Sequence, residues 1–169
     1  MPKTLEQIRL SFAKLDPIAS GKLGEKFARQ WFTKTQWKFE DIEQSPDTLS
    51  EKLRAHGGKR PDFLVESHTK TVITTVDAKF ASTNEGKSFA MPDWEIEKYR
   101  RCKAYIEAEF PGETCEVLFM VFPKEFDGKR LVWVDLSEFE DGEPTTVRGS
   151  PGTQVSLENR AELWCTNEA

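Results

Sequence analysis

Apolar residues recur every three to four positions in three stretches of the chain, which predicts amphipathic helices over 4–15, 21–32 and 94–110. A fourth helix is expected over 45–56, because this stretch opens with a Ser-Pro-Asp sequence that supplies a cap, a proline in the first turn and an early acidic residue. Gly57 directly follows this stretch, as glycine does at many helix ends.

Five shorter stretches have the character of β-strands, because they are rich in β-branched and aromatic residues or almost continuously apolar. They are 37–42, 61–66, 72–79, 115–122 and 130–136. The order of these elements predicts an α/β fold in which helices flank a mixed central sheet. We expect one domain over 1–169, with 137–169 as an irregular C-terminal extension.

The composition is that of a soluble globular protein, since 37% of the 169 residues are hydrophobic and 31% are charged. No apolar run reaches the ~20 residues of a membrane span, and the first residues lack the apolar core of a signal peptide, so a cytoplasmic location is expected. Three cysteines without CxxC spacing argue against a disulfide framework and a zinc site. The net charge of −5 argues against broad binding to nucleic acid but leaves room for a local basic groove.

The two central strands carry a charged group of residues. Side chains alternate along 72–79, so Asp77 and Lys79 share one face. A hairpin register that pairs Leu64 with Thr75 also sets Asp62 opposite Asp77. Carboxylates that face each other at roughly 4.5–5.5 Å repel, so we expect a cation between them. Mg²⁺, which is commonly held by one or two carboxylates, fits that position.

Lys79 cannot ligate a metal while it is protonated. It can orient an attacking water or stabilise the charge that builds on a phosphoryl oxygen in the transition state. An alternative is that Asp62, Asp77 and Lys79 form a structural ion cluster without catalytic function.

Pro61-Asp62, fourteen intervening residues and then Asp77-Ala78-Lys79 resemble the signature of the PD-(D/E)XK nuclease superfamily, which includes restriction enzymes, junction resolvases and repair exonucleases. The family core is a helix, three strands, a helix and a strand, similar to the order expected over 20–136. The resemblance implies a restriction-endonuclease-like α-β-β-β-α-β core and a metal-dependent nuclease. It also implies that the carbonyl of Ala78 is a further metal ligand.

Glu25 lies off the apolar stripe of the second helix, which is expected to be Leu23, Phe27 and Trp31. From spacing alone it reads as a solvated acid near a helix N-terminus, where the macrodipole favours negative charge. The resemblance implies another role, because many family members begin with a helix whose Glu reaches the metal, often after small residues such as Gly24.

On the long helix, Glu95, Tyr99, Cys102 and Ile106 fall on one face. One interpretation is a buried tyrosine bonded to a local glutamate. The pattern also resembles the Gln-x-x-x-Tyr motif of one branch of these nucleases, with Glu95 in place of glutamine. By that resemblance Glu95 and Tyr99 support Lys79 or the phosphate.

Several other residues are candidates for contact with nucleic acid, although each is equally compatible with an ordinary solvated position. We expect 80–92 to be a polar loop that leaves the strand at the site, with Phe89 as a stacking platform for a base. The candidates for contact with phosphates are Lys59, Arg60, Lys87, Ser88, Lys98 and Arg101.

The sequence thus predicts a nuclease that uses Mg²⁺ or Mn²⁺, acts on DNA rather than RNA and cuts as an endonuclease. Two alternatives stay open: an inactive member of the same fold that serves binding or assembly, and a toxin-like ribonuclease with a neutralising protein partner. A homodimer is also compatible, since resolvases and many restriction enzymes pair two subunits to cut two strands.

Overall fold

The structure is a computed structural model that describes residues 4–9, 23–42, 55, 57–67 and 71–167. Both histidines lie outside these residues, as do nearly all of the helix expected over 45–56 and the second half, 10–15, of the first predicted helix. Within the described ranges, no helix is both long and apolar enough to cross a membrane.

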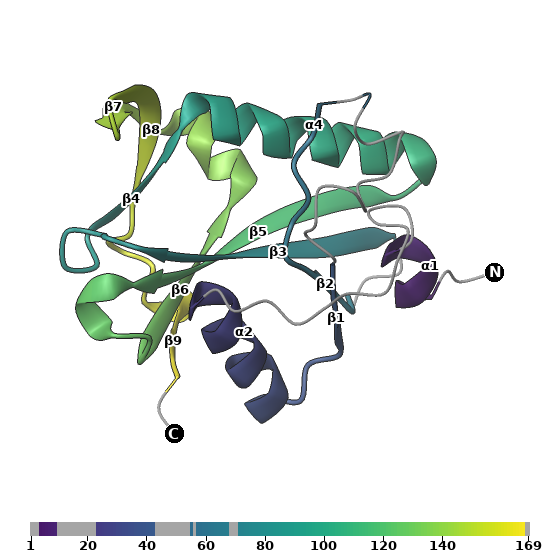
Figure 1. Ribbon diagram of the computed structural model, residues 1–169, viewed down its shortest axis with the longest axis horizontal. Coiled ribbons are helices and arrows are strands. Elements are labelled where there is room, and N and C mark those ends of the chain that lie inside the picture. Colours follow the sequence, from purple (N-terminus) through teal and green to yellow (C-terminus); the bar gives the residue numbers. More distant parts are fainter. Residues whose placement is uncertain (1–3, 10–22, 43–54, 56, 68–70, 168–169) are drawn as a thin grey trace.

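A six-stranded sheet forms the centre of the protein (Figure 1), and its strands lie in the order β1-β2-β3-β5-β6-β9. β3 and β5 run parallel, whereas every other neighbouring pair is antiparallel, so the mixed sheet is confirmed. The strands are β1 (Phe39–Asp41), β2 (Phe63–Val65), β3 (Val72–Ala81), β5 (Thr114–Pro123), β6 (Arg130–Asp135) and β9 (Trp164–Thr166).

Helices cover both faces of this sheet, as predicted. Figure 1 shows α4 (Asp93–Glu109) along one face and α2 (Leu23–Lys34) on the other, while α1 (Leu5–Arg9) lies beside β1. From α2 to β5 the chain forms a helix, three strands paired in the main sheet, a helix and a strand, which is the predicted core order. The described residues also form three short 3-10 helices: η2 (Lys124–Phe126), η3 (Leu136–Asp141) and η4 (Ala161–Leu163).

A second, three-stranded sheet differs from the sequence prediction. It has the order β4-β8-β7, formed by β4 (Ser88–Pro92), β7 (Glu143–Val147) and β8 (Ser150–Ser156). The predicted polar loop over 80–92 therefore contains a strand, and the extension over 137–169, expected to be irregular, contains three strands. Phe89 is only 2% exposed, so it is a core residue and not the predicted stacking platform.

Only part of the stripe predicted for α2 faces the sheet. Trp31 is buried, as predicted, but Leu23 is 43% exposed and Phe27 is half-buried, whereas Gly24, Ala28 and Phe32 are buried. The reason is close packing: a Cβ on Gly24 would lie 3.2 Å from the backbone nitrogen of Phe80 in β3. The small side chains let the helix approach the sheet, and apolar size alone does not reveal this.

Gly24→Val tests this contact. The added side chain would press against strand backbone, which cannot move aside as a flexible side chain can, and overpacking of this kind costs about 1–3 kcal/mol. We expect urea unfolding to show a loss of that size. Lys26→Val on the exposed side of the same helix has the same β-branched side chain and serves as the control. Equal stability of the two variants would contradict the close-packing explanation.

Candidate active site

The site forms where the pairing between β2 and β3 stops and β3 continues beyond it. Leu64 pairs with Thr75, as predicted, and the pairing ends with Phe63 opposite Val76. β3 extends five residues further, to Ala81, without β2 beside it. The first turn of α2 packs against this free stretch of backbone through Gly24. The end of a short strand thus leaves room for a helix terminus at the edge of β3.

The side chain of Asp62 extends the contact between the two strands by one further hydrogen bond. Its Oδ2 accepts a hydrogen bond of 2.8 Å from the backbone N–H of Ala78, two residues beyond the last paired residue of β3. This bond satisfies a strand amide and fixes the carboxyl group at the start of β2. The position of Asp62 is therefore set by the backbone of the strand that carries Asp77 and Lys79.

A cavity of about 260 Å³ brings the four predicted catalytic side chains together. We call it the carboxylate cavity, because three acidic side chains from α2, the start of β2 and β3 line it. Its lining residues are Leu23, Gly24, Glu25, Lys59, Asp62, Asp77, Ala78, Lys79 and Phe80.

Glu25 is buried in this cavity with only 3% of its surface exposed, so its interpretation as a solvated acid is wrong. Neither of its carboxylate oxygens accepts a hydrogen bond from a described residue. A buried carboxylate that accepts no hydrogen bond is costly, so a cation beside it would be stabilising. Its helix brings some compensation, since Glu25 lies in the first turn of α2, where the macrodipole favours negative charge.

The pKa of Asp62 is raised well above its ordinary value. Burial is the largest cause, and the neighbouring carboxyl groups of Asp77 and Glu25 add to it, while the N–H of Ala78 acts in the opposite direction. Burial disfavours the charged form, and so does each like charge nearby. Both effects favour the protonated form of Asp62, and a cation beside these carboxyl groups would oppose them.

Lys79 is a positive group beside these carboxyl groups. Its Nζ lies 3.1 Å from Oδ2 of Asp77 and 3.2 Å from Oε2 of Glu95, and it donates a hydrogen bond of 3.1 Å to the hydroxyl of Tyr99. Burial lowers the pKa of Lys79, but Asp77 and Glu95 raise it more, so the net shift is upward. Lys79 is thus a fixed cation at neutral pH.

Glu95 joins two lysines. Its Oε1 lies 3.0 Å from Nζ of Lys59, and its other oxygen contacts Lys79. Burial raises the pKa of Glu95, but Lys79 and Lys59 lower it more, so the carboxylate is held in its charged form. Tyr99, fully buried, lies 5.3 Å from each ammonium, measured to its ring centroid. We call these four residues, Lys59, Lys79, Glu95 and Tyr99, the lysine cluster.

The cluster decides between the two interpretations of the long helix. Tyr99 is buried, but its hydroxyl bonds to Lys79, so the face of Glu95 and Tyr99 is directed at the site lysine. The place of Lys59 in this cluster was missed by sequence reasoning. Its signal was weak, because a lysine beside two glycines is typical of a solvated loop.

The remaining candidates lie apart from the carboxylate cavity. Arg60 is 6% exposed and so offers little surface to a phosphate. Lys87 is an exposed turn residue and Ser88 begins β4, and neither lines the cavity. Lys98 and Arg101 are exposed on α4, where Arg101 pairs with Glu97 at 3.4 Å. Phosphate contact by Lys87, Ser88, Lys98 and Arg101 stays a prediction, because none of these four residues lines the cavity.

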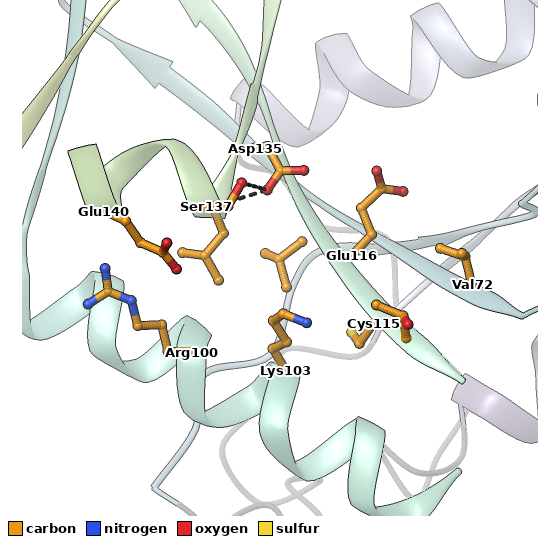
Figure 2. A pocket seen from close by; sticks show the side chains of 11 residues that line it. Val72, Arg100, Lys103, Cys115, Glu116, Asp135, Ser137 and Glu140 are labelled. Atoms are coloured by element: carbon orange, nitrogen blue, oxygen red, sulfur yellow. Dashed lines mark hydrogen bonds between the residues drawn. The ribbon is translucent and has the colours of Figure 1, made fainter. Parts of the chain in front are cut away.

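A second cavity, of about 440 Å³, lies between α4, β5 and η3 (Figure 2). Arg100 and Lys103 line it from α4, and Glu140 lies across it on η3. Two of its charged groups have structural partners: Lys103 pairs with Glu107 at 2.8 Å, and Asp135 caps η3 by accepting a 2.9 Å hydrogen bond from the backbone N–H of the residue two positions on. None of the residues that line it is among the predicted site residues.

No protein-family model matches the chain, and no curated protein sequence does so either. Among solved structures, the chain is similar to Archaeoglobus fulgidus Hjc, a Holliday junction resolvase from an archaeal hyperthermophile. The TM-score is 0.44 and the sequence identity 11%, over 86% of this chain and 92% of that one.

The donor set of the carboxylate cavity suits a hard divalent cation. Such ions bind carboxylate oxygens, and Glu25 offers two that no described residue uses. Among the described residues, no group of three His, Cys, Asp or Glu side chains already converges as a metal site. Asp77 is instead held by Lys79 at 3.1 Å. The three carboxyl groups share a cavity and fit the ion by chemistry, without meeting at one point.

Asp62→Asn tests whether the ionised carboxyl group of Asp62 destabilises the folded protein. Because the folded-state pKa of Asp62 is raised, folding becomes less favourable as the pH rises from the unfolded-state value of about 3.9 through the folded-state value. Asparagine keeps an oxygen for the N–H of Ala78 and cannot ionise. Without divalent cations at pH 7, we expect thermal unfolding to show a higher Tm, by at least about 2 °C, which corresponds to ~1 kcal/mol in a domain of this size.

Near pH 3 the gain should disappear, because both residues are then neutral. Asp41→Asn is the control, since Asp41 pairs with Arg29 at 2.7 Å and its loss should bring no gain. A lower Tm for Asp62→Asn at pH 7 would show that the cavity does not repel this charge.

Proposed function

We propose that the chain is a metal-dependent nuclease that hydrolyses phosphodiester bonds, with DNA as its substrate and endonucleolytic cutting as its mode. One observation carries the proposal: the buried carboxylate of Glu25, which accepts no hydrogen bond from a described residue, shares a cavity with Asp62, Asp77 and a fixed lysine cation. Carboxylates for a hard cation and an ammonium beside them are the parts that phosphodiester hydrolysis requires.

In this proposal Glu25, Asp62 and Asp77 hold Mg²⁺ or Mn²⁺, together with the carbonyl of Ala78. The ion supplies a water of lowered pKa and neutralises charge on the scissile phosphate. Asp62 is well suited to its part because its other function, the hydrogen bond from Ala78, fixes it on the strand that carries Asp77. The position of the ligand therefore does not depend on a flexible loop.

Lys79 stabilises the negative charge that develops on the phosphoryl oxygens. A preorganised cation in a partly water-excluded site contributes much more than one in bulk water, because it needs no reorganisation during the reaction. Glu95 and Tyr99 hold the ammonium at 3.2 Å and 3.1 Å, so they act as positioning residues. Lys59, which shares Glu95 and is partly exposed, adds a second positive charge at the mouth of the cavity.

Binding of the ion is tested without any activity. Thermal unfolding with and without MgCl₂ or MnCl₂ should show a higher Tm for the wild type, because a ligand that binds only the folded state stabilises it, by about 2.7 kcal/mol at a hundredfold excess over Kd. Glu25→Gln and Asp77→Asn should lose most of this shift. Glu97→Gln, on the exposed side of α4, should keep it. An equal shift in all four proteins would place the ion elsewhere.

Cleavage is tested on supercoiled plasmid, a four-way junction, single-stranded DNA and tRNA, each with Mg²⁺, Mn²⁺ or EDTA. We expect DNA to be cut only with a divalent cation, and Lys79→Ala to be slower by about 10²–10³-fold, the usual effect of removing one preorganised charge-stabilising donor. Lys26→Ala, exposed on α2, is the matched control and should cut normally.

Circular dichroism shows whether each variant is folded. A folded Lys79→Ala protein that cuts at the wild-type rate would overturn the assignment. Folded wild-type protein that cuts no substrate would favour the binding or assembly alternative, and cutting of tRNA alone would favour the ribonuclease.

A further inference from the structure

Trp94 is the most exposed of the large hydrophobic side chains in the described part of the chain, at 52%. A single exposed apolar residue is common on protein surfaces and by itself indicates nothing. Its position is what matters here. It directly precedes Glu95, whose carboxylate contacts the ammonium groups of both Lys59 and Lys79. In the sequence, an accessible indole therefore adjoins Glu95, the residue that joins the two lysines of the lysine cluster.

Positive side chains accompany this indole along α4. The ammonium of Lys98 lies 5.3 Å from the centroid of the Trp94 ring, and Arg101 follows one turn later on the same side of the helix. We call Trp94, Lys98 and Arg101 the Trp94 strip. The side chains of Lys98 and Arg101 are exposed. Among the described residues, the exposed Glu97 pairs with Arg101 at 3.4 Å, and exposed pairs of this kind are weak.

The strip borders the segment that leads into the site. The backbone N–H of Lys59 donates a 3.2 Å hydrogen bond to the carbonyl of Lys98, and the guanidinium of Arg101 lies against Gly57. Three residues after Lys59 the same segment reaches Asp62 in the carboxylate cavity. The strip and the cavity are thus joined through one short stretch of chain, with Lys59 between them.

We propose that the Trp94 strip binds an unpaired nucleotide next to the scissile phosphate, with the base stacked on Trp94 and the flanking phosphates beside Lys98 and Arg101. This inference rests on the proposed nuclease function and adds a substrate class: DNA that contains a single-stranded segment at the cutting site. In a duplex both faces of a base are covered by its neighbours, so only an unstacked base can lie on an aromatic ring. The exposed indole matches the π-face of an unstacked base, and the positive charges of Lys98 and Arg101 match the phosphates of such a strand.

The decisive experiment measures the affinity of fluorescein-labelled single-stranded DNA, the blunt duplex of the same sequence and the matched RNA strand, by anisotropy in EDTA, so that no cutting occurs. Stacking of one base on an aromatic side chain is worth about 1–3 kcal/mol. We therefore expect Trp94→Ala to bind the single strand about 5- to 150-fold more weakly. Trp94→Phe should recover most of this loss, and affinity for the blunt duplex should stay within about twofold, since no base of the duplex reaches the ring.

Trp37→Ala is the matched control, because Trp37 is also partly exposed, at 39%, and does not line the carboxylate cavity. Tryptophan fluorescence adds a reading that a merely structural role would not change: the single strand should quench the wild type and Trp37→Ala more than Trp94→Ala. Lys98→Ala should lower the slope of log affinity against log salt by about one. Thermal unfolding shows that each variant is folded at the temperature of measurement.

Single-strand affinity of Trp94→Ala within about twofold of the wild type, or an equal loss for single strand and duplex, would overturn the inference. If that result accompanies metal-dependent cutting that needs Lys79, the nuclease assignment stands and only the role of the Trp94 strip fails. If Trp94-dependent binding is found but no cation supports cutting, the Trp94 strip stands as a binding site and the nuclease assignment fails. Wild-type protein that binds none of the three probes would overturn both. Tighter binding of RNA than of DNA through Trp94 would keep the Trp94 strip as a binding site but make RNA its ligand.

Discussion

The structure depends on the balance between buried carboxyl groups and the few cations that face them. Glu25, Asp62 and Asp77 line one cavity, and the only positive groups of the described chain that line it are Lys59 and Lys79. The carboxylate of Glu95 forms ion pairs with both lysines. Burial, together with the neighbouring carboxyl groups of Asp77 and Glu25, raises the pKa of Asp62 well above its ordinary value. Such a cavity is a poor choice for stability alone, because buried like charges cost more than an apolar packing of the same volume.

The geometry behind this balance comes from unequal strand lengths. β2 has three residues and β3 has ten, so one edge of β3 loses its partner after Val76. Two groups use the free edge: the side chain of Asp62 bonds to Ala78, and the first turn of α2 packs on the backbone through Gly24. Both acids that approach Asp77 are therefore fixed by contacts with the strand that carries it. The site does not need a long loop to assemble.

Much of this arrangement could be predicted from the sequence, because it follows from local periodicity. Alternation along β3 places Asp77 and Lys79 on one face, and the pairing of Leu64 with Thr75 follows from the hairpin. The helical spacing of Glu95 and Tyr99 gave the buried face of α4 in the same way. These are relations between residues near in sequence or in the same element.

The errors concern relations between distant segments. Nothing local shows that β4 leaves the main sheet to pair with β8, whose partner residues lie some sixty positions further along the chain. Ser88–Pro92 therefore looked like a loop and its Phe89 like a surface residue. Arg60 and Lys59 stand side by side in a polar segment, yet one is buried and the other bonds to Glu95, thirty-six positions away. Burial of this kind is decided by the packing of the whole chain.

The small sheet has a consequence for how much of the chain the site requires. β8 holds the start of α4 through a 2.7 Å hydrogen bond from Thr153 to Asp93, two residues before Glu95. Tyr99 packs on Phe119, with 5.0 Å between ring centroids, and Phe119 packs on Phe139 at 5.9 Å. Residues beyond 136 thus brace the helix that orients the site lysine, although none of them lines the cavity. A chain that ended near residue 136 would retain the acids and the lysine but lose the packing that supports α4, whose Glu95 and Tyr99 contact Lys79.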